Sequence, residues 1–387
     1  MKKDTLLVHS GRKPKDNFGI VNPPVYHAST ITFPTVAKYN EKPDVPFDGV
    51  QYGRTGTPTT FALEDSICSL YGGYKTIATS SGAAAIAIAM SALLKNGDHA
   101  IVIDNVYGPT RTRVSDDLMA RAGVDISYFD PFQSIKDLIQ PETKVVYIEV
   151  PGSLTFEMID IKAVVKEAHA AGALVIMDNT WATGLFFQPF EHGVDIIVEA
   201  GTKYIGGHAD IMLGLITVKT PSQHLAIKST ANAMGNCPGP DDCYLGLRGF
   251  RTLSVRMERH QKNAIQVAKW LKEREEVSRV LYPALPDDQG YKIWKRDFKG
   301  ACGLFGIILN YFPEKAIAAM LDNMKFFAMG ASWGGYESLI IPTEPSKIRS
   351  ASIWSSPGQC LRLHIGLEDP SDLISDLEEG LRRLTST

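Results

Sequence analysis

The stretch ALVIMDNTWATGLFFQPFEHGVDIIVEAGTKYIGGHADIMLG, residues 173–214, decides the fold of this chain. An apolar run at 174–177 leads to Asp178, and a second run at 196–198 leads to the segment that carries Lys203. Short runs rich in valine and isoleucine are typical of buried parallel strands. The stretch therefore predicts two strands whose carboxyl ends present a carboxylate and an amine.

A buried carboxylate and a buried lysine are both costly unless each has an ionic partner or a shifted pKa. Pyridoxal phosphate is one ligand that would use both. Its aldehyde would form a Schiff base with Lys203, and Asp178 would hold its ring nitrogen protonated. A salt bridge between two strand ends is the other interpretation, and this stretch alone leaves both open.

The composition sets limits on the class of protein. The chain has 387 residues, of which 21% are charged and 44% hydrophobic, as in a soluble protein of two or three domains. A net charge of −3 without a dense Lys/Arg block predicts no nucleic-acid partner. No signal peptide follows Met1 and no apolar run approaches the ~18–20 residues of a membrane span, so we expect a cytoplasmic protein without a membrane partner. Five scattered cysteines indicate neither a zinc site nor a disulfide framework.

Residues 1–58 differ in composition from the rest of the chain. Repeated prolines exclude a long helix there, and the segment cannot easily build a core of its own. We expect an extended N-terminal arm that packs on another subunit.

From residue 59 onward, short apolar runs alternate with helical patterns. Strands are predicted at 76–79, 99–104, 125–129, 144–150, 173–178 and 195–200. Helices are predicted at 61–71, 82–94 and 161–170. The alternation is typical of an α/β domain with a mostly parallel, doubly wound sheet, assigned to 59–250, in which ligands bind at the carboxyl ends of the strands. Asp104, Glu149, Asp178 and Lys203 fall near such ends.

The pattern changes after about residue 244. Residues 241–277 contain no proline and predict one helix, or two with a kink at Gly249. Strands are predicted at 303–310 and 361–365. The last helix has Asp369 before its first turn, Pro370 at its first position and leucines along one face. Residues 251–387 are therefore assigned to a smaller α+β domain.

Small residues between a strand and a helix suggest a phosphate site. The backbone N–H groups of Ser81, Gly82 and Ala83, together with the helix dipole, make a phosphate cradle, to which Thr202 could add a hydroxyl. Tight packing at the turn is the alternative. Tyr107 could stack on a cofactor ring, or be an ordinary half-buried tyrosine.

Two arginines are candidates for anion binding. Arg54, which with Tyr52 ends the proline-rich arm, suits a phosphate, although a solvated loop charge is the alternative. Arg362 lies on an apolar strand, where a substrate α-carboxylate could pair with it in a bidentate manner. An internal salt bridge would satisfy Arg362 equally well.

Two patterns point to other chemistry. His208 and Asp210 are metal-ligand types without a third ligand nearby, so no metal site is assigned and both are interpreted as structural. Residues 330–334, GASWG, match the G-x-S-x-G elbow of serine hydrolases, with Ser332 as nucleophile and His364 as the base. The elbow needs a strand before it and a helix after it, and the residues that follow are a poor helix start.

The motifs occur together in one family. The sequence resembles the γ-family of fold-type I pyridoxal phosphate enzymes, the Cys/Met metabolism group, and within it the β-lyase branch. The matching segments run in order along nearly the whole chain: YGRTGTPT (52–59), SGAAA (81–85), DNVYGPT (104–110), EVPGS (149–153), MDNTWATG (177–184), GTKYIGGHAD (201–210), LGLRGFRTL (245–253), SWGGYESL (332–339) and LRLHIGLED (361–369). The resemblance implies a seven-stranded, transferase-like sheet and a homotetramer built from dimers that share active sites.

The resemblance also implies roles for individual residues. Lys203 would be the lysine that forms the Schiff base with the cofactor, Asp178 would pair with the ring nitrogen, and Tyr107 would stack on the ring. Ser332 would place the freed lysine. The cofactor phosphate would be bound by Ser81, Gly82, Ala83 and Thr202. The phosphate in a neighbouring subunit would be contacted by Tyr52 and Arg54. The substrate would be contacted by Arg362, Ser332, Trp333 and Tyr107.

The reaction implied by the β-lyase branch is cleavage of L-cystathionine to homocysteine, pyruvate and ammonia, a step of methionine biosynthesis, with cysteine desulfhydrase activity on the side. Ala200 and Trp333 stand where γ-eliminating members usually carry serine and an aliphatic residue, which favours the β-lyase branch. Ala331 stands where some β-lyases have tyrosine. A γ-lyase or γ-synthase remains the alternative.

Overall fold

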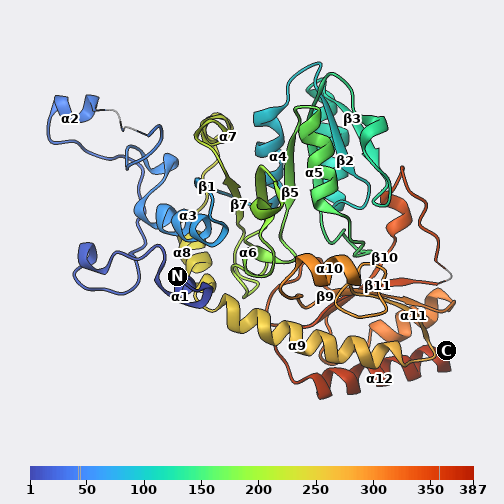
Figure 1. Ribbon diagram of the computed structural model, residues 1–387. Coiled ribbons are helices and arrows are strands. Elements are labelled where there is room, and N and C mark those ends of the chain that lie inside the picture. The colour runs from blue at the N-terminus through green and yellow to red at the C-terminus, as the bar shows by residue number, and fades with distance from the viewer. Residues whose placement is uncertain (42, 44, 357) are drawn as a thin grey trace.

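The computed structural model describes residues 1–387 except 42, 44 and 357. Its larger sheet has seven strands in the order β1-β7-β6-β5-β4-β2-β3 (Figure 1). These strands are β1 (Lys75–Thr79), β2 (His99–Ile103), β3 (Asp125–Phe129), β4 (Thr143–Glu149), β5 (Leu174–Asp178), β6 (Ile196–Glu199) and β7 (Gly214–Val218). β2 to β6 pair in parallel, and β7 runs antiparallel to both β1 and β6. The predicted mostly parallel, seven-stranded α/β sheet is confirmed.

Helices that precede or connect the strands cover this sheet. α4 (Gly82–Leu93) packs on β1, β6 and β7 and also touches α7 (Pro221–Ala233). α5 (Ile161–Ala170) packs on β5, and α3 (Pro58–Tyr71) packs on β1. Because apolar side chains from the strands and helices meet on both faces of the sheet, the central strands are buried over most of their length. Such burial fixes the end of β5, where Asp178 lies, and the end of β6, which leads to Lys203.

The second sheet has four antiparallel strands in the order β10-β11-β9-β8. They are β8 (Val277–Leu281), β9 (Leu304–Leu309), β10 (Leu339–Thr343) and β11 (Cys360–His364). α9 (Leu253–Lys272) and α12 (Pro370–Ser386) lie side by side along this sheet (Figure 1). α8 (Pro240–Phe250) precedes α9, so the proline-free segment forms two helices that part just after Gly249. The division into domains at residues 58 and 250 stays a proposal.

Three strands were not predicted from the sequence: β7, β8 and β10. β7 breaks the βα alternation, since it follows β6 without a helix between them and runs antiparallel. β10 contains Pro342, which removes a backbone donor and weakens a strand pattern. The predicted N-cap at Asp369 and first-turn Pro370 of α12 are present, and Asp369 accepts a hydrogen bond from the N–H of Ser371.

The N-terminal arm is only partly extended. α1 (Lys3–His9) buries Leu7 completely against its own chain, where it contacts α3 and α9. Arg251 donates hydrogen bonds to the carbonyl oxygens of Leu7 and Ser10. The arm, predicted to be extended, therefore begins with a helix over residues 3–9 that packs on its own chain. Farther along, α2 (Val36–Asn40) projects away from the body of the chain (Figure 1).

Candidate active site

A cavity of about 390 Å³ opens at the carboxyl ends of the large sheet, where the small sheet meets it. Asp178 reaches it from the end of β5, Lys203 from the loop after β6, and Arg362 from β11. Nine of the residues predicted from the sequence line it: Ser81, Gly82, Ala83, Tyr107, Asp178, Thr202, Lys203, Trp333 and Arg362. The fold therefore gathers segments that are far apart in the chain around one space.

Asp178 is held rigidly at the floor of the cavity. Its Oδ1 accepts hydrogen bonds from the backbone N–H of Thr180 at 2.9 Å and from the Thr180 hydroxyl at 2.6 Å. The same hydroxyl accepts from the N–H of Ala200 at 2.9 Å, which ties the end of β5 to the end of β6. Burial raises the pKa of Asp178, while Thr180 and Lys203 act in the opposite direction. Thr180 was missed from the sequence, although a hydroxyl two residues after a carboxylate is a recognisable turn signal.

Lys203 contacts the loop that precedes β10 of the small sheet. Its Nζ donates a hydrogen bond to Oγ of Ser332 at 2.7 Å, and lies 5.4 Å from the centre of the Trp333 ring. Burial, and then the positive charge of Arg362, lower the pKa of Lys203 to about 8, against the opposing effect of Asp178. A neutral amine is thus accessible near physiological pH, as a nucleophile or general base requires.

Ser332 is not arranged as a hydrolase nucleophile. Residues 330–338 form an irregular loop, and the element that follows is strand β10. Both ring nitrogens of His364 are engaged by backbone groups: Nε2 accepts from the N–H of Gly334, and Nδ1 bonds the carbonyl oxygen of Glu337. The serine hydrolase alternative is therefore contradicted by the fold around Ser332.

The start of α4 forms one end of the cavity. Ser81 caps this helix, its hydroxyl accepting from the N–H of Ala84 at 3.1 Å. First-turn N–H groups have no partner inside a helix, so those of Gly82 and Ala83 are available to an anion. Thr202 lines the same end, but its hydroxyl donates to the carbonyl oxygen of Leu213 at 3.1 Å and accepts from the Leu213 N–H at 2.9 Å. The hydroxyl of Thr202 is thus already committed, which the sequence did not indicate.

Tyr107 is positioned through a buried carboxylate. Its backbone N–H donates to Oε2 of Glu149 at 2.7 Å, and the Ser153 hydroxyl donates to Oε1 of the same carboxylate. Glu149 pairs in register with Asp178 across β4 and β5, and burial together with this neighbouring carboxylate raises its pKa. The sequence placed Glu149 at a strand end without giving it a role; this contact supplies one.

Arg362 is surrounded by carbonyl oxygens. Its Nη2 donates to the backbone oxygens of Gly330, Ala331 and Ser332 at 3.0–3.3 Å. Burial lowers the pKa of Arg362 to about 10. Across the residues that the structure describes, no carboxylate lies within salt-bridge distance of this guanidinium, so the internal salt bridge considered from the sequence is not formed. A ligand carboxylate can occupy that role.

Tyr52 and Arg54 lie outside the cavity of their own chain. Nη1 of Arg54 donates to the carbonyl oxygen of Asn232 at 2.8 Å, and the Tyr52 ring is half exposed. The structure does not bring either residue to Lys203 of the same chain.

The polar groups of the cavity fit pyridoxal phosphate. In the described part of the chain, Oδ2 of Asp178 has no hydrogen-bond partner, so it can accept a bond from a protonated ring nitrogen. A Cβ added at Gly82 would lie only 2.7 Å from Cβ of Ala200, so glycine is what lets the helix start approach the strand end that leads to Lys203. An anion cradle, a partly free carboxylate and an amine of lowered pKa are the three groups that this cofactor needs.

Comparison with known proteins agrees with this chemistry. The family described as Cys/Met metabolism PLP-dependent enzyme matches residues 4–382. The cystathionine beta-lyase of Salmonella typhimurium is 40% identical, with 98% of each chain covered. The L-alanine/L-glutamate racemase of Wolbachia pipientis is 41% identical, with 99% of this chain and 98% of the relative covered.

A solved structure shows the same fold over the full length. The cystathionine gamma synthase of Xanthomonas oryzae pv. oryzae, in complex with cystathionine, superposes with a TM-score of 0.90 at 30% identity, covering 100% of this chain and 99% of the other. With the family matched over nearly every residue and relatives at about 40% identity, the cofactor is pyridoxal phosphate, and the chain is an enzyme that belongs to the Cys/Met metabolism family of PLP-dependent enzymes.

Proposed function

We propose that this enzyme cleaves L-cystathionine by β-elimination, giving homocysteine, pyruvate and ammonia, and that L-cysteine is a side substrate. The observation that carries the proposal is the pairing of Lys203 with Ser332 at 2.7 Å, beside the cavity that Lys203 lines together with Arg362 and Asp178. Trp333, which the sequence associates with the β-lyase branch, lines the same space. Cystathionine beta-lyases are among the relatives of about 40% identity.

Each residue has a defined task in this reaction. The bound cofactor supplies an electron sink for the charge released at the substrate Cα. Arg362 binds the α-carboxylate through its guanidinium N–H groups, since in the described part of the chain only Nη2 bonds the loop carbonyl oxygens. Nζ of Lys203 removes the α-proton as general base and then returns a proton to the departing sulfur. Ser332 holds Nζ beside the reacting carbon, and Tyr107 covers the cofactor ring.

The test separates this proposal from its rivals by product. Purified holoenzyme is incubated with L-cystathionine, and pyruvate and 2-oxobutyrate are assayed separately. Pyruvate in equal amount to homocysteine supports β-elimination. 2-Oxobutyrate with cysteine would instead assign a γ-lyase, and consumption of an activated homoserine ester would assign a γ-synthase.

The γ-chemistry alternative is favoured by the solved γ-synthase that superposes on this chain. Methionine γ-lyase belongs to the same alternative, and methanethiol release from L-methionine would reveal it. The racemase relative adds one more outcome, which the formation of D-alanine from L-alanine would reveal. In that case Lys203 would exchange the α-proton without loss of a β-substituent.

A shared active site explains the position of the arm. Tyr52 and Arg54 lie outside their own cavity, and exposed apolar side chains such as Val36 and Tyr39 lie on the same arm. We propose that Tyr52 and Arg54 reach the phosphate end of a neighbouring subunit's cavity in a homotetramer, and that the enzyme is cytoplasmic. Light scattering of the eluting protein gives the oligomeric mass; an active monomer would contradict the shared site.

Within the described residues, no helix is long and apolar enough to cross a membrane.

A further inference from the structure

The connection between β10 and β11 is far longer than two paired antiparallel strands need. Hairpin loops usually have about 2–5 residues, whereas this connection begins at Glu344 and ends at Gln359. Its first part, residues 345–352, is here called the strap. Ile348 in the strap lines the cavity that holds Lys203 and Arg362. A connection between two strands of the small sheet thus forms part of the wall around the proposed substrate.

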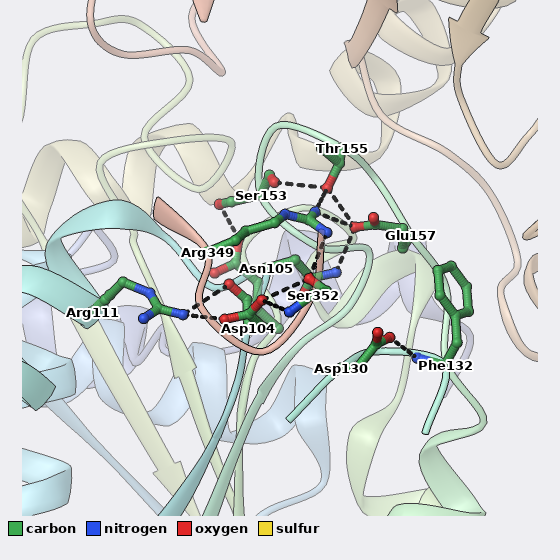
Figure 2. A network of polar contacts seen from close by, with 11 residues as sticks. Asp104, Asn105, Arg111, Asp130, Phe132, Ser153, Thr155, Glu157, Arg349 and Ser352 are labelled. Atoms are coloured by element: carbon green, nitrogen blue, oxygen red, sulfur yellow. Dashed lines mark hydrogen bonds and ion pairs between the residues drawn. The ribbon is translucent and has the colours of Figure 1, made fainter. Parts of the chain in front are cut away.

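A buried ion pair fixes the strap directly after Ile348. Nη2 of Arg349 lies 2.8 Å from Oε2 of Glu157, and both side chains are almost fully buried. The same nitrogen donates to the hydroxyl of Thr155. Asn105 donates to Oε2 of Glu157 at 2.8 Å, so the carboxylate that receives Arg349 is itself held in place (Figure 2).

A second buried carboxylate holds the next turn of the strap. Asp104, at the end of β2, accepts bonds from the N–H of Ser350 at 3.0 Å, and from the N–H and hydroxyl of Ser352 at 2.8 and 2.6 Å (Figure 2). Arg111 pairs with the same carboxylate and donates to the Ser350 hydroxyl at 3.1 Å. Asp104 is therefore committed to the strap, although its place at a strand end suggested a ligand contact.

Two buried ion-pair clusters are an expensive way to attach a surface connection. Desolvation offsets much of their attraction, so they add little net stability but specify one geometry. Both clusters hold segments that line the cavity, because Ser153, Leu154 and Phe156 belong to the loop that carries Thr155 and Glu157. The Arg349 cluster ties the strap to that loop, and the Asp104 cluster ties it to the end of β2, so together they fix the position of Ile348 at the cavity.

The charged groups of the cavity are already assigned. In the described part of the chain, its charged lining residues are Glu149, Asp178, Lys203 and Arg362, and each has a role in positioning Tyr107, binding the cofactor or binding the α-carboxylate. Arg349 and Glu157 neutralise each other outside the lining. The substituent beyond the substrate sulfur can therefore pack against apolar wall on this side, and Ile348 is the strap's part of that wall.

We propose that the strap determines substrate specificity: Ile348 contacts the group attached to the substrate sulfur, and the Arg349 and Asp104 clusters hold Ile348 against it. This rests on the proposed β-elimination, since it concerns the leaving group of that reaction. In chemical terms the strap recognises the first apolar carbons after sulfur, which cystathionine shares with S-alkyl-L-cysteines.

The test compares L-cysteine, which has no sulfur substituent, with S-propyl-L-cysteine. Each yields pyruvate, ammonia and a thiol or hydrogen sulfide, so kcat/KM is measured by one assay. In Ile348→Ala, the ratio of kcat/KM for S-propyl-L-cysteine to that for L-cysteine should fall about 10-fold or more, because a missing apolar contact is worth roughly 10–200-fold. In Ile348→Phe the ratio should also fall, through crowding. An unchanged ratio in both variants overturns the proposal.

The clusters are tested without touching the cavity lining. Ser352→Ala removes the hydroxyl that bonds Asp104 and Arg349 but keeps the backbone N–H that bonds Asp104, so the chain should fold, and the same ratio should fall by a few-fold. Ser346→Ala, at an exposed strap position on the other side of Ile348, is the matched control and should leave the ratio unchanged. Equal ratios in Ser352→Ala and Ser346→Ala would overturn the role of the clusters.

A binding measurement keeps the strap proposal distinct from the reaction proposal. The Lys203→Ala protein, loaded with cofactor, is titrated with S-propyl-L-cysteine, and the change in visible absorption gives a dissociation constant without turnover. When Ile348→Ala is added to Lys203→Ala, the dissociation constant for S-propyl-L-cysteine should rise about 10-fold. The dissociation constant for L-cysteine should stay unchanged. If wild-type enzyme forms no pyruvate but the dissociation constant still shifts, the β-lyase function fails, although Ile348 still contacts the group attached to sulfur; if pyruvate is formed and the constant does not shift, the strap proposal alone is overturned.

Discussion

The backbone N–H of Gly334 donates a hydrogen bond to Nε2 of His364 at 3.1 Å. This bond requires a neutral imidazole with its proton on Nδ1, which in turn bonds the carbonyl oxygen of Glu337 at 3.0 Å. Burial lowers the pKa of His364 well below its usual range, so the neutral form is maintained. One buried ring thus holds both ends of the loop that follows Ser332 and Trp333, the two neighbours of Lys203.

Replacing His364 with phenylalanine should loosen this loop. The ring volume stays, but the Gly334 N–H and the Glu337 carbonyl lose their partner. Leaving buried polar groups unsatisfied should lower the free energy of unfolding by about 1–3 kcal/mol. Urea unfolding of the holoenzyme measures this loss. His364→Gln, which carries one acceptor and a donor, should recover part of it; equal stability of wild type and His364→Phe would exclude a supporting role.

Gly334 itself should not tolerate a side chain. Its φ of +88° lies in the left-handed region, and an added Cβ would come within about 3 Å of Cα, C and Cβ of Lys203. Gly334→Ala therefore forces the loop away from the lysine, at a cost on the order of 1–3 kcal/mol for the backbone strain alone. The visible absorption of the lysine-bound cofactor should change in wavelength or intensity. Gly335→Ala next to it is the matched control, because its φ is not positive and the added Cβ would meet the end of the Glu337 side chain and not the backbone of Lys203; a normal spectrum in Gly334→Ala would contradict the close packing.

Lys203→Ala should abolish turnover. The variant lacks the amine that takes the α-proton, and loss of general base catalysis alone costs roughly 10²–10⁴-fold in rate. Pyruvate formation over hours, under saturating substrate and added cofactor, gives the residual activity. Ser332→Ala should lose less, because the amine remains and only its 2.7 Å partner is removed. Near-normal turnover in Lys203→Ala would remove the basis of the proposed reaction.

Capture of the cofactor by the cofactor-free protein should depend on pH through Lys203. Only the neutral amine can attack the aldehyde, and the folded-state pKa is lowered from 10.5 to about 8, chiefly by burial. The rate should therefore rise with pH and level off above about pH 8. The sign for stability follows from the same shift: the cost of burying the charged amine is fully present below about pH 8 and is relieved as pH rises toward 10.5.

Arg362 provides the control for this assignment. Its positive charge is the second cause of the lowered lysine pKa, so Arg362→Leu should move the midpoint of the capture rate to higher pH. Stopped-flow absorbance between pH 6.5 and 10 measures both proteins. A midpoint that does not move, or moves to lower pH, would show that another group limits capture.

The sequence predicted the parts of the site that follow directly from strand ends. Asp178 and Lys203 both come after apolar runs, and parallel strands bring their carboxyl ends to one edge. Glu149, at the end of the neighbouring strand, could be placed but not interpreted, because its role depends on the N–H of Tyr107 reaching across from another loop. Local pattern carries no information about such a contact.

Ile348 shows the same limit more strongly. It lies in a connection with no hydrophobic period, and contacts between segments far apart in the chain, such as the pairing of Arg349 with Glu157, bring it to the cavity. The missed strands have a related cause, since β7 reverses direction where a βα alternation predicts a parallel strand. Thr202 was placed correctly, yet its bonds to Leu213 depend on the loop that leads into β7. Tertiary contacts, rather than propensity, decided these features.

Arg362→Leu should weaken binding of every amino-acid substrate through the α-carboxylate. Charged, buried hydrogen-bonded pairs cost about 2–5 kcal/mol when one partner is truncated, so kcat/KM should fall by roughly 10²-fold or more. Arg362→Lys should be intermediate, since it keeps a charge but not the planar fork that matches a carboxylate. Alkyl amines without a carboxylate discriminate between two causes of such a loss. If Nη2 mainly supports the loop through the carbonyl oxygens of Gly330 and Ser332, the variant loses amine and amino-acid binding alike. If Arg362 binds the carboxylate, amine binding to the holoenzyme, followed by visible absorption, stays close to that of the wild type.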